Sequence, residues 1–346
     1  PLRRGFFVGK KEHMTNHEAE TIVSSTGSLG LEHRSYNRVY LNWRGVISDV
    51  LFIERQYHRA QEAIHRGIAT RCVLRAMLTE DALSNVAMIS ASTTVEAAVP
   101  AGNVDGHPVW MTLFGLNAQH REPITNIEDM VEATTTYTSP SMLPHERVQR
   151  LNERGFRCDG QIDSRHIDAV HSLWEKTFEW TREGVETLAL RLRKQQQLHP
   201  SRREVWFSGV VDPDDCVVSV AMAELLRLPL GNGEYVPIVE STEWRTREGH
   251  EGQGVMAAGV SFLHAQIIQD LKELPRPPVI IAETNYVSRA DRVGNAVGMT
   301  VPLRRVGETK IPQILQQNVA VGDGRMPEGL RDFTMMYQCS TAEETL

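Results

Sequence analysis

The second half of the chain shows regular apolar patterns separated by turn residues. Short apolar runs predict strands at 156–162, 205–211, 216–226 and 235–244. Two helices are expected between the first two of these strands, at 165–178 and 181–196. Because only short turns separate the last three strands, we predict that they form an antiparallel meander.

A glycine-rich segment follows this meander, Gly249-His250-Glu251-Gly252-Gln253-Gly254. After it, apolar residues recur at three- and four-residue spacing over 256–274, which predicts a long helix that ends at the following prolines. The apolar run 279–282 is expected to be a buried strand parallel to the one before the loop, because a crossover of this length joins parallel strands. A short helix at 288–296 and a strand at 333–338 complete the pattern.

The first half has a weaker pattern. Residues 15–45 are expected to be irregular, and 44–78 to form one or two helices because apolar residues recur at about helical spacing. Residues 86–99 and 107–115 predict a hairpin, since an Asp-Gly step lies in the segment that joins them. A polar linker is expected at 134–144. No motif in this half indicates a function.

These patterns divide the chain into three parts. Residues 1–14 are taken as a tag or disordered arm and excluded from the fold prediction. Residues 15–150 are expected to form a smaller accessory α+β domain, which either shapes an acceptor pocket or makes a homodimer contact. Residues 151–346 are expected to form the second domain, a mixed sheet with flanking helices, so the predicted fold class is α+β.

Composition narrows the functional classes. The 346 residues include 41% apolar and 23% charged residues, normal values for a soluble globular protein. Four widely spaced cysteines, no secretory signal and no membrane-length apolar run predict a cytoplasmic protein without a membrane partner. A net charge of −7 argues against a nucleic-acid partner. The thirteen histidines show no ligand spacing, so no metal is expected.

The glycine-rich loop carries the clearest chemical signal. A helix N-terminus exposes unpaired amides and the positive end of the macrodipole, which suits a pyrophosphate. Glycines let a phosphate approach the backbone without meeting a Cβ atom. The alternative is a glycine-rich turn that only starts a helix. The predicted cofactor-binding residues in and beside this loop are Trp244, Arg245, Arg247, Gly249, His250, Gly252, Gln253, Gly254 and Val255.

The order of elements and this loop resemble the GNAT acyltransferase superfamily over roughly residues 150–340. Gly252 and Gly254 match the two small positions of the family pattern Gln/Arg-x-x-Gly-x-Gly/Ala. Gly249 stands where the family usually has Gln or Arg, and Arg247 is the candidate for the missing charge. Asn285, followed by Ser288, sits where the family commonly has an Asn near the pantetheine arm. The resemblance implies acetyl-CoA, or another acyl-CoA, as co-substrate.

The resemblance also implies catalytic roles. It places a glutamate base on the strand before the loop, and Glu240 is the first choice; the alternative for Glu240 is a structural carboxylate paired with an arginine. Period-two alternation puts Trp244 on the same face as Glu240, and Glu243 on the opposite face. Tyr286 is the candidate general acid, with Tyr337 as the alternative.

The predicted function is transfer of acetyl from acetyl-CoA to a primary amine of a small molecule, by direct attack in a ternary complex. One alternative is an NAD(P)-binding Rossmann-type oxidoreductase, because 252–257 fits G-x-G-x-x-A at a helix start. Another is a non-catalytic acyl-CoA-binding module. For the first half, a degenerate second acyltransferase lobe is an alternative, although this half contains no second glycine-rich loop.

Overall fold

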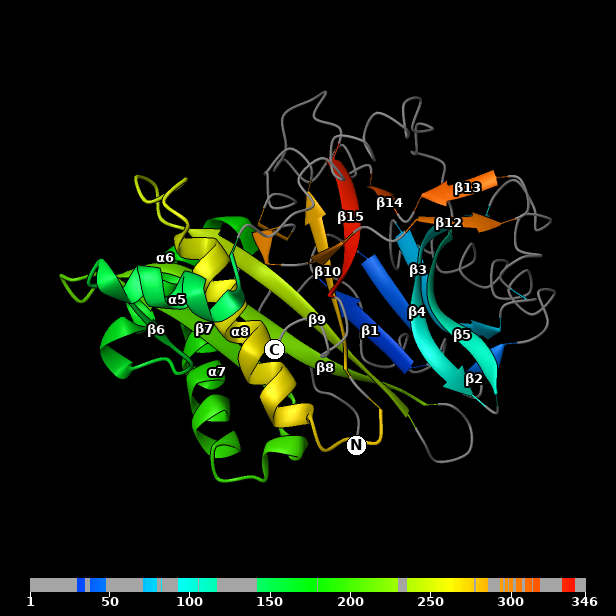
Figure 1. The fold of residues 1–346 in the computed structure, drawn as a ribbon, viewed down its shortest axis with the longest axis horizontal. Helices are drawn as coiled ribbons and strands as arrows, with labels where there is room; N and C mark the ends of the chain where they lie inside the picture. Colours follow the sequence, from blue (N-terminus) through cyan, green and yellow to red (C-terminus); the bar gives the residue numbers. More distant parts are fainter. Residues whose placement is uncertain are drawn as a thin grey trace.

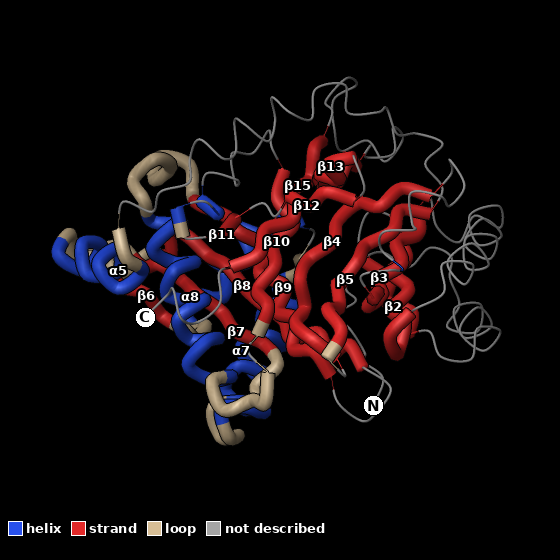
Figure 2. Tube along the Cα trace, turned by 45° about the vertical axis from the view of Figure 1, so that its right-hand side comes forward, coloured by secondary structure: helices blue, strands red, loops and turns tan. Residues whose placement is uncertain are grey.

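Two β-sheets organise the described part of the molecule. The computed structural model describes residues 30–34, 38–47, 71–79, 82, 93–104, 106–116, 142–178, 180–229, 235–276, 278–285, 293–294, 296–297, 299–300, 303–306, 309–312, 314–317 and 332–339. An eight-stranded sheet is built from the second half of the chain and a five-stranded sheet from the first half. The two sheets lie side by side, with the described helices on the side of the larger sheet (Figures 1 and 2).

The larger sheet has the order β11-β15-β10-β9-β8-β7-β6, and β14 pairs with β15. Its strands are β6 (Arg157–Asp159), β7 (Val205–Val211), β8 (Val217–Pro229), β9 (Tyr235–Thr246), β10 (Val279–Asn285), β11 (Met299–Thr300), β14 (Ile314–Gln317) and β15 (Asp332–Cys339). Its neighbours are antiparallel except β9 and β10, which are parallel. The predicted meander, the parallel strand after the loop and the α+β fold class are therefore confirmed.

Helices cover both faces of this sheet. They are α5 (Pro144–Glu153), α6 (Ile167–Phe178), α7 (Arg182–Gln195) and α8 (Val255–Leu271), with short 3-10 turns η2 (Ser164–His166) and η3 (Pro200–Arg202). Phe207 packs with the apolar sides of α6 and α7, whereas its neighbour Trp206 packs with α8. β7 is buried on both faces, which explains its continuous apolar sequence. None of the described helices is both long and apolar enough to cross a bilayer.

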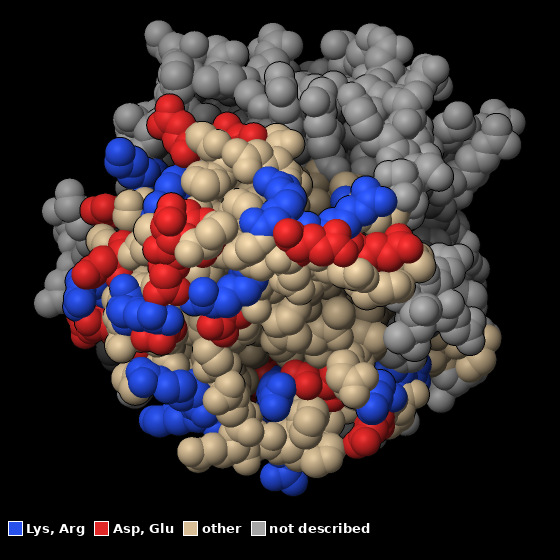
Figure 3. Space-filling view, turned by 60° about the vertical axis from the view of Figure 1, so that its left-hand side comes forward, with Lys and Arg blue, Asp and Glu red and all other residues tan. Residues whose placement is uncertain are grey.

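The surface of the helix-rich side carries charges of both signs. Figure 3 shows Lys and Arg side chains interspersed with Asp and Glu side chains over this face, so the positive charges do not form a continuous basic surface there. Nucleic-acid binding depends on a concentrated positive field. The described part of this face therefore gives no support to a nucleic-acid partner.

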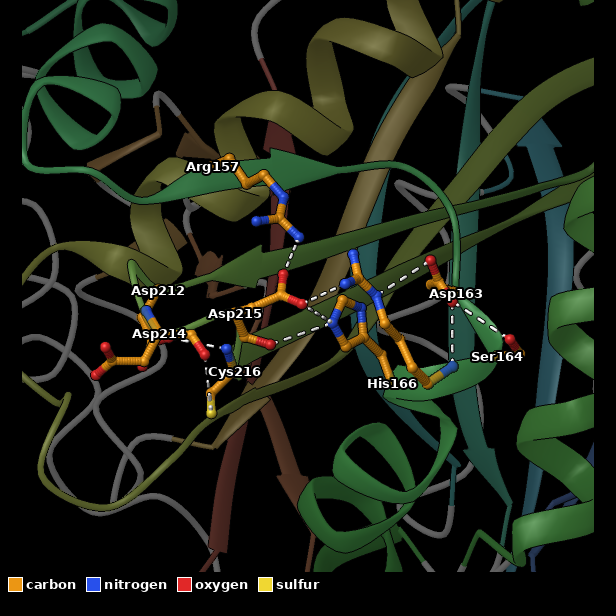
Figure 4. A network of polar contacts seen from close by, with 9 residues as sticks. Arg157, Asp163, Ser164, His166, Asp212, Asp214, Asp215 and Cys216 are labelled. Carbon is orange, nitrogen blue, oxygen red and sulfur yellow. Dashed lines mark hydrogen bonds and ion pairs between the residues drawn. The ribbon is translucent and has the colours of Figure 1, made fainter.

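An ion-pair network fastens β6 and η2 to the turn between β7 and β8 (Figure 4). The Asp215 carboxylate accepts hydrogen bonds from Arg157 Nη2 at 2.5 Å and lies 2.5 Å from Arg165 Nη1. The Arg157 hydrogen bond is the main reason why the pKa of Asp215 lies below its usual range, and Arg165 adds to it. His166 is buried here, and its Nε2 lies 3.2 Å from the Asp215 carbonyl oxygen.

β9 contains a bulge near its end. The register between β8 and β9 shifts between Thr242 and Arg245, so that Ala221 of β8 faces both Glu243 and Trp244. Glu243 adopts a left-handed backbone conformation with φ of 60°. An extra residue in one strand bends that strand and reverses the alternation of faces beyond it.

The bulge changes where the Trp244 side chain points. Trp244 packs against the apolar cluster beneath α8, and its Nε1 donates to Ser241 Oγ at 3.0 Å. Strict alternation had placed Trp244 on the same face as Glu240. That prediction is wrong, because the bulge inserts one residue between them.

The first half forms a sheet with the order β1-β2-β3-β5-β4. Its strands are β1 (Gly30–Arg34), β2 (Arg38–Ile47), β3 (Arg71–Thr79), β4 (Thr93–Val104) and β5 (His107–Leu116), and a small separate hairpin joins β12 (Leu303–Val306) to β13 (Thr309–Pro312). The β4–β5 hairpin is confirmed. The irregular structure expected up to residue 45 is wrong at β1 and β2, and the expected helix is wrong at β3. Short apolar runs do not distinguish a buried strand from a helix.

The two sheets share one strand arrangement. The series β1-β2-β3-β5-β4 corresponds pair by pair to β8-β9-β10-β15-β11, since both run antiparallel, parallel, antiparallel, antiparallel. In each series a strand late in the sequence is inserted between two earlier ones. The first sheet therefore repeats the topology of the larger sheet from β8 onward, although the sequence shows no repeat at a fixed short period.

Candidate active site

The two parallel strands of the larger sheet separate partway along their length. Val279 pairs with Ile238, Ile280 with Val239 and Ile281 with Glu240. Beyond this point β9 continues on β8, while β10 continues on β15. The facing edges of β9 and β10 thus stop pairing with each other at Glu240, and their course can be followed in Figure 1.

Glu240 is the β9 residue at which the pairing ends. Its side chain is only 2% exposed. It stands directly opposite Glu224 of β8, so the two carboxylates lie on the same face of the sheet. Arg191 of α7 reaches Glu224 at 3.3 Å, which identifies this face as the one covered by α6 and α7. A buried carboxylate therefore stands where the strands part.

The bulge beside Glu240 is held from α6. Trp174, which is fully buried, donates from Nε1 to the Glu243 carbonyl oxygen at 2.8 Å. Its ring lies 4.9 Å from that of Trp180 and 6.0 Å from that of Phe207. Trp174 is therefore part of the apolar core between the sheet and helices α6 and α7. The hydrogen bond gives it a second role in fixing the backbone at the bulge.

The opposite face of β9 is tied to α8. His264 Nε2 lies 3.1 Å from Ser241 Oγ, which also accepts the hydrogen bond from Trp244. Complete burial lowers the pKa of His264 to about 3, so its imidazole is neutral. A line of three side chains thus connects the end of β9 to the interior of α8.

The glycine-rich loop joins this strand end to the start of α8. Gly249, Gly252 and Gly254 all have positive φ angles, of 87°, 74° and 78°. At each of them the space where a Cβ atom would stand is open for 4 Å. Gly254 is the N-cap residue, and the first hydrogen bond of the helix runs from Ala258 N to Gly254 O. The backbone N–H groups of the first turn therefore have no acceptor within the helix. The loop therefore fits a phosphate group that approaches the backbone closely.

The charges at the loop are mixed. Arg245 is exposed, and Arg247 is half-buried with its backbone N–H bound to the Val218 carbonyl oxygen at 2.7 Å. Glu248 and Glu251 are exposed on the same loop. The two arginines offset the two carboxylates, so backbone amides and the helix dipole supply the remaining attraction for an anion.

Most of the predicted site residues lie close together along the chain. Glu240 and the candidates from Trp244 to Val255 occupy β9, the loop and the first residue of α8. Asn285 ends β10, opposite Thr334 of β15. Tyr286 and Ser288 lie outside the described residues, so the proposed acid stays a prediction. Among the described residues, no group of His, Cys, Asp and Glu is placed to hold a metal ion.

Three further residues touch the site and were not assigned to it from the sequence. Trp174 and His264 fix the two faces of β9, as described above. Arg154, at the end of α5, donates to the carbonyl oxygen of Gln253 in the loop at 2.8 Å. Arg154 and Gln253 are 99 residues apart. No local pattern connects such positions, so only the fold could reveal these contacts.

Comparison with known proteins adds a structural context. No protein-family model matches the sequence, and no curated protein matches it. Among solved structures, the chain is similar to Arabidopsis thaliana NAA60 in complex with acetyl-CoA, with 10% identity, 54% of this chain and 99% of that chain covered, and a TM-score of 0.35. It is also similar to an N-acetyltransferase from Staphylococcus aureus Mu50, with 11% identity, 53% and 96% covered, and a TM-score of 0.35.

A third similar structure is a GCN5-related N-acetyltransferase from Kribbella flavida, with 16% identity, 42% of this chain and 32% of that chain covered, and a TM-score of 0.28. At identities and TM-scores of this size, the likeness carries no statement about chemistry. What the chain does has to follow from its own residues.

Proposed function

We propose that this chain is an acyl-CoA-dependent N-acyltransferase, which transfers acetyl from acetyl-CoA to a primary amine of a small molecule by direct attack in a ternary complex. The observation that carries the proposal is the parting of β9 and β10 at Glu240, directly before a glycine-rich helix start. One stretch of chain therefore contains a buried carboxylate, the point where β9 and β10 stop pairing with each other, and a glycine-rich helix start that would suit a phosphate.

The loop residues would hold the pyrophosphate of CoA. The amides from Gly252 to the first turn of α8 supply donors, and the positive end of the α8 dipole favours the anion. Arg245 and Arg247 add positive charge at the end of β9. Asn285, at the end of β10, is proposed to lie near the pantetheine arm, as the family resemblance implies.

Glu240 would serve as the general base. When bound, acyl-CoA supplies an acyl group activated as a thioester. A primary amine is mostly protonated at neutral pH, so a base has to remove a proton before the nitrogen can attack. Glu240 would accept that proton directly or through a water molecule. Tyr286 is proposed to donate a proton to the departing thiolate.

The structure bears on the two alternatives differently. A Rossmann enzyme places its glycine-rich turn within alternating parallel strands and helices. Here the strand before the loop is the last of the antiparallel meander β7-β8-β9, which disfavours that alternative. A non-catalytic acyl-CoA-binding module would use the same loop, so turnover has to distinguish it from an enzyme.

Binding measurements with loop variants test the proposal. Gly252→Asp and Gly254→Asp should each weaken acetyl-CoA binding at least tenfold in isothermal titration calorimetry, because an added carboxylate blocks and repels the pyrophosphate. Gly106→Asp is a matched control, since Gly106 also has a positive φ, of 81°, and open space, but lies in the β4–β5 turn. It should bind acetyl-CoA as the wild type does.

Two results would overturn the proposal. One is wild-type-like affinity in both loop variants, and the other is binding of NADH by a protein that does not bind acetyl-CoA. Thiol release from acetyl-CoA with a panel of amines then separates the enzyme from a binding module. Binding without turnover across a broad panel would favour the module.

A further inference from the structure

A guanidinium group from outside the glycine-rich loop spans part of its backbone. Arg154 caps the C-terminal end of α5, and its Nη1 donates to the Gln253 carbonyl oxygen at 2.8 Å. Its Nη2 donates to Gln253 Oε1 at 3.1 Å. The Gln253 side chain passes the contact on, because its Nε2 donates to the Gly249 carbonyl oxygen at 2.9 Å. One chain of hydrogen bonds therefore runs from α5 across the loop.

These bonds orient two peptide groups. In a trans peptide the carbonyl oxygen and the following N–H point in opposite directions. Because Arg154 holds the Gln253 carbonyl, the Gly254 N–H is turned away from α5. At the other end, Gln253 Nε2 holds the Gly249 carbonyl. Carbonyl oxygens repel a phosphate, so holding the Gln253 and Gly249 carbonyls against donors reduces that repulsion at the loop.

Arg154 is itself held in place. Its guanidinium lies 5.1 Å from the centre of the Phe156 ring, which in turn meets His250 of the loop edge-on at 6.4 Å. Leu151 of α5 shares one buried cluster with Val255 and Ala258 in the first turn of α8. The base of α5 and the start of α8 are thus packed together, so the guanidinium keeps its position relative to the loop.

We propose that Arg154 is a positioning residue for the pyrophosphate of acyl-CoA: it fixes the Gln253 peptide so that the loop amides face the anion, and it adds a positive charge beside the loop. This inference rests on the proposed function. The alternative role for Arg154 is a structural tie between α5 and α8 with no effect on the anion site.

Ligands with and without a pyrophosphate distinguish these roles. Arg154→Met should raise the dissociation constant of acetyl-CoA about tenfold, as expected for loss of a charged hydrogen-bonding group. It should leave the dissociation constant of S-acetylpantetheine, which has no pyrophosphate, within twofold of the wild type. Arg154→Lys keeps the charge but cannot make both hydrogen bonds in the same geometry. Its dissociation constant for acetyl-CoA should therefore lie between those of the wild type and Arg154→Met. Calorimetry measures the first ligand and an NMR titration the second.

Arg150→Met is the matched control, because Arg150 is an exposed arginine in the last turn of the same helix. It should bind both ligands as the wild type does. The inference is overturned if Arg154→Met behaves like this control, or if it weakens both ligands equally, which would indicate a structural tie only. If the wild type binds no acetyl-CoA, the proposed function itself fails, and that outcome is separate.

Discussion

Glu240 combines three features that suit a proton acceptor. It is buried, it stands opposite Glu224, and it occupies the last paired position before β9 and β10 part. Each of these features is local to one residue. The sequence could single out Glu240 only through the family resemblance, since a glutamate within an apolar strand has no distinctive spacing of its own.

Replacing Glu240 tests its role without removing its shape. Glu240→Gln should lower turnover by about 10²- to 10⁴-fold, with the largest loss at neutral and lower pH, where the amine most needs a base. The affinity for acetyl-CoA should stay the same. Glu204→Gln is the control, because Glu204 is more exposed and pairs with Arg227. An unchanged pH–rate profile in Glu240→Gln would exclude it as the base.

His264 makes acid stability sensitive to one side chain. Its pKa is lowered by burial to about 3 in the folded protein, against 6.5 ordinarily. Below pH 6.5 the unfolded chain therefore binds a proton that the folded chain does not. As pH is lowered, this residue reduces the free energy of unfolding by up to about 1.4 kcal/mol per pH unit. The loss is complete near the folded pKa.

His264→Gln should remove this acid sensitivity while it keeps a polar group near Ser241. Urea unfolding between pH 7 and pH 4.5 measures the difference between variant and wild type. The free energy of unfolding should fall less steeply with pH in the variant. Equal slopes would show that His264 is not held neutral by the fold.

At the scale of elements, the ion-pair network around Asp215 contributes to stability, and its contribution can be measured by a single substitution. Arg157 of β6 and Arg165 of η2 both reach this one carboxylate in the β7–β8 turn. Asp215 has φ of 63°, and Asn tolerates the same left-handed conformation. Asp215→Asn therefore removes the charge without straining the turn.

We expect Asp215→Asn to lower the melting temperature at pH 7, and to do so less at high salt because the ion pairs are exposed. The pKa of Asp215 is lowered in the folded state, so its contribution is present above the ordinary aspartate pKa and is lost as pH falls through the folded value. Thermal melts at pH 7 and pH 3 should show the two proteins approaching each other. A difference independent of pH would contradict this.

Most elements of the second half could be predicted, because their apolar runs have distinct lengths and clear turn residues between them. β7 ends where its pattern ends, and α8 begins directly after the loop. The bulge at Glu243 could not be predicted, since it depends on pairing with β8. In the first half, β3 resembled part of a helix because a buried strand has no polar alternation to reveal it.

At the scale of the whole molecule, the two topologically equivalent sheets differ at the position of the proposed binding site. β2 and β3 pair at seven positions, which resume at Val46 after an irregularity that follows Asn42, whereas β9 and β10 pair at three of the described positions. No glycine-rich loop follows β2, because 48–54 contains no glycine. The repeated arrangement could not be predicted from the sequence, because it lies in the order of the strands and not in matching residues.

Native mass spectrometry tests the consequence of this difference. With excess acetyl-CoA, each chain should bind one molecule, because among the described residues only the larger sheet combines parted strands with a glycine-rich helix start. Gly254→Asp should bind at least tenfold more weakly. A second molecule bound with similar affinity, or undiminished binding by Gly254→Asp, would place a site on the first sheet.

The separation of β9 and β10 also has a consequence for local thermal stability. Within the described part of the chain, 241–246 pair with β8 only, whereas 238–240 pair with β8 on one side and with β10 on the other. On heating, the sheet should therefore open at 241–246 before it opens elsewhere, and hydrogen exchange at the backbone amides of this segment should be fast. A bound molecule whose own amides lay along that open edge would act as a missing strand, so substrate and scaffold would protect each other.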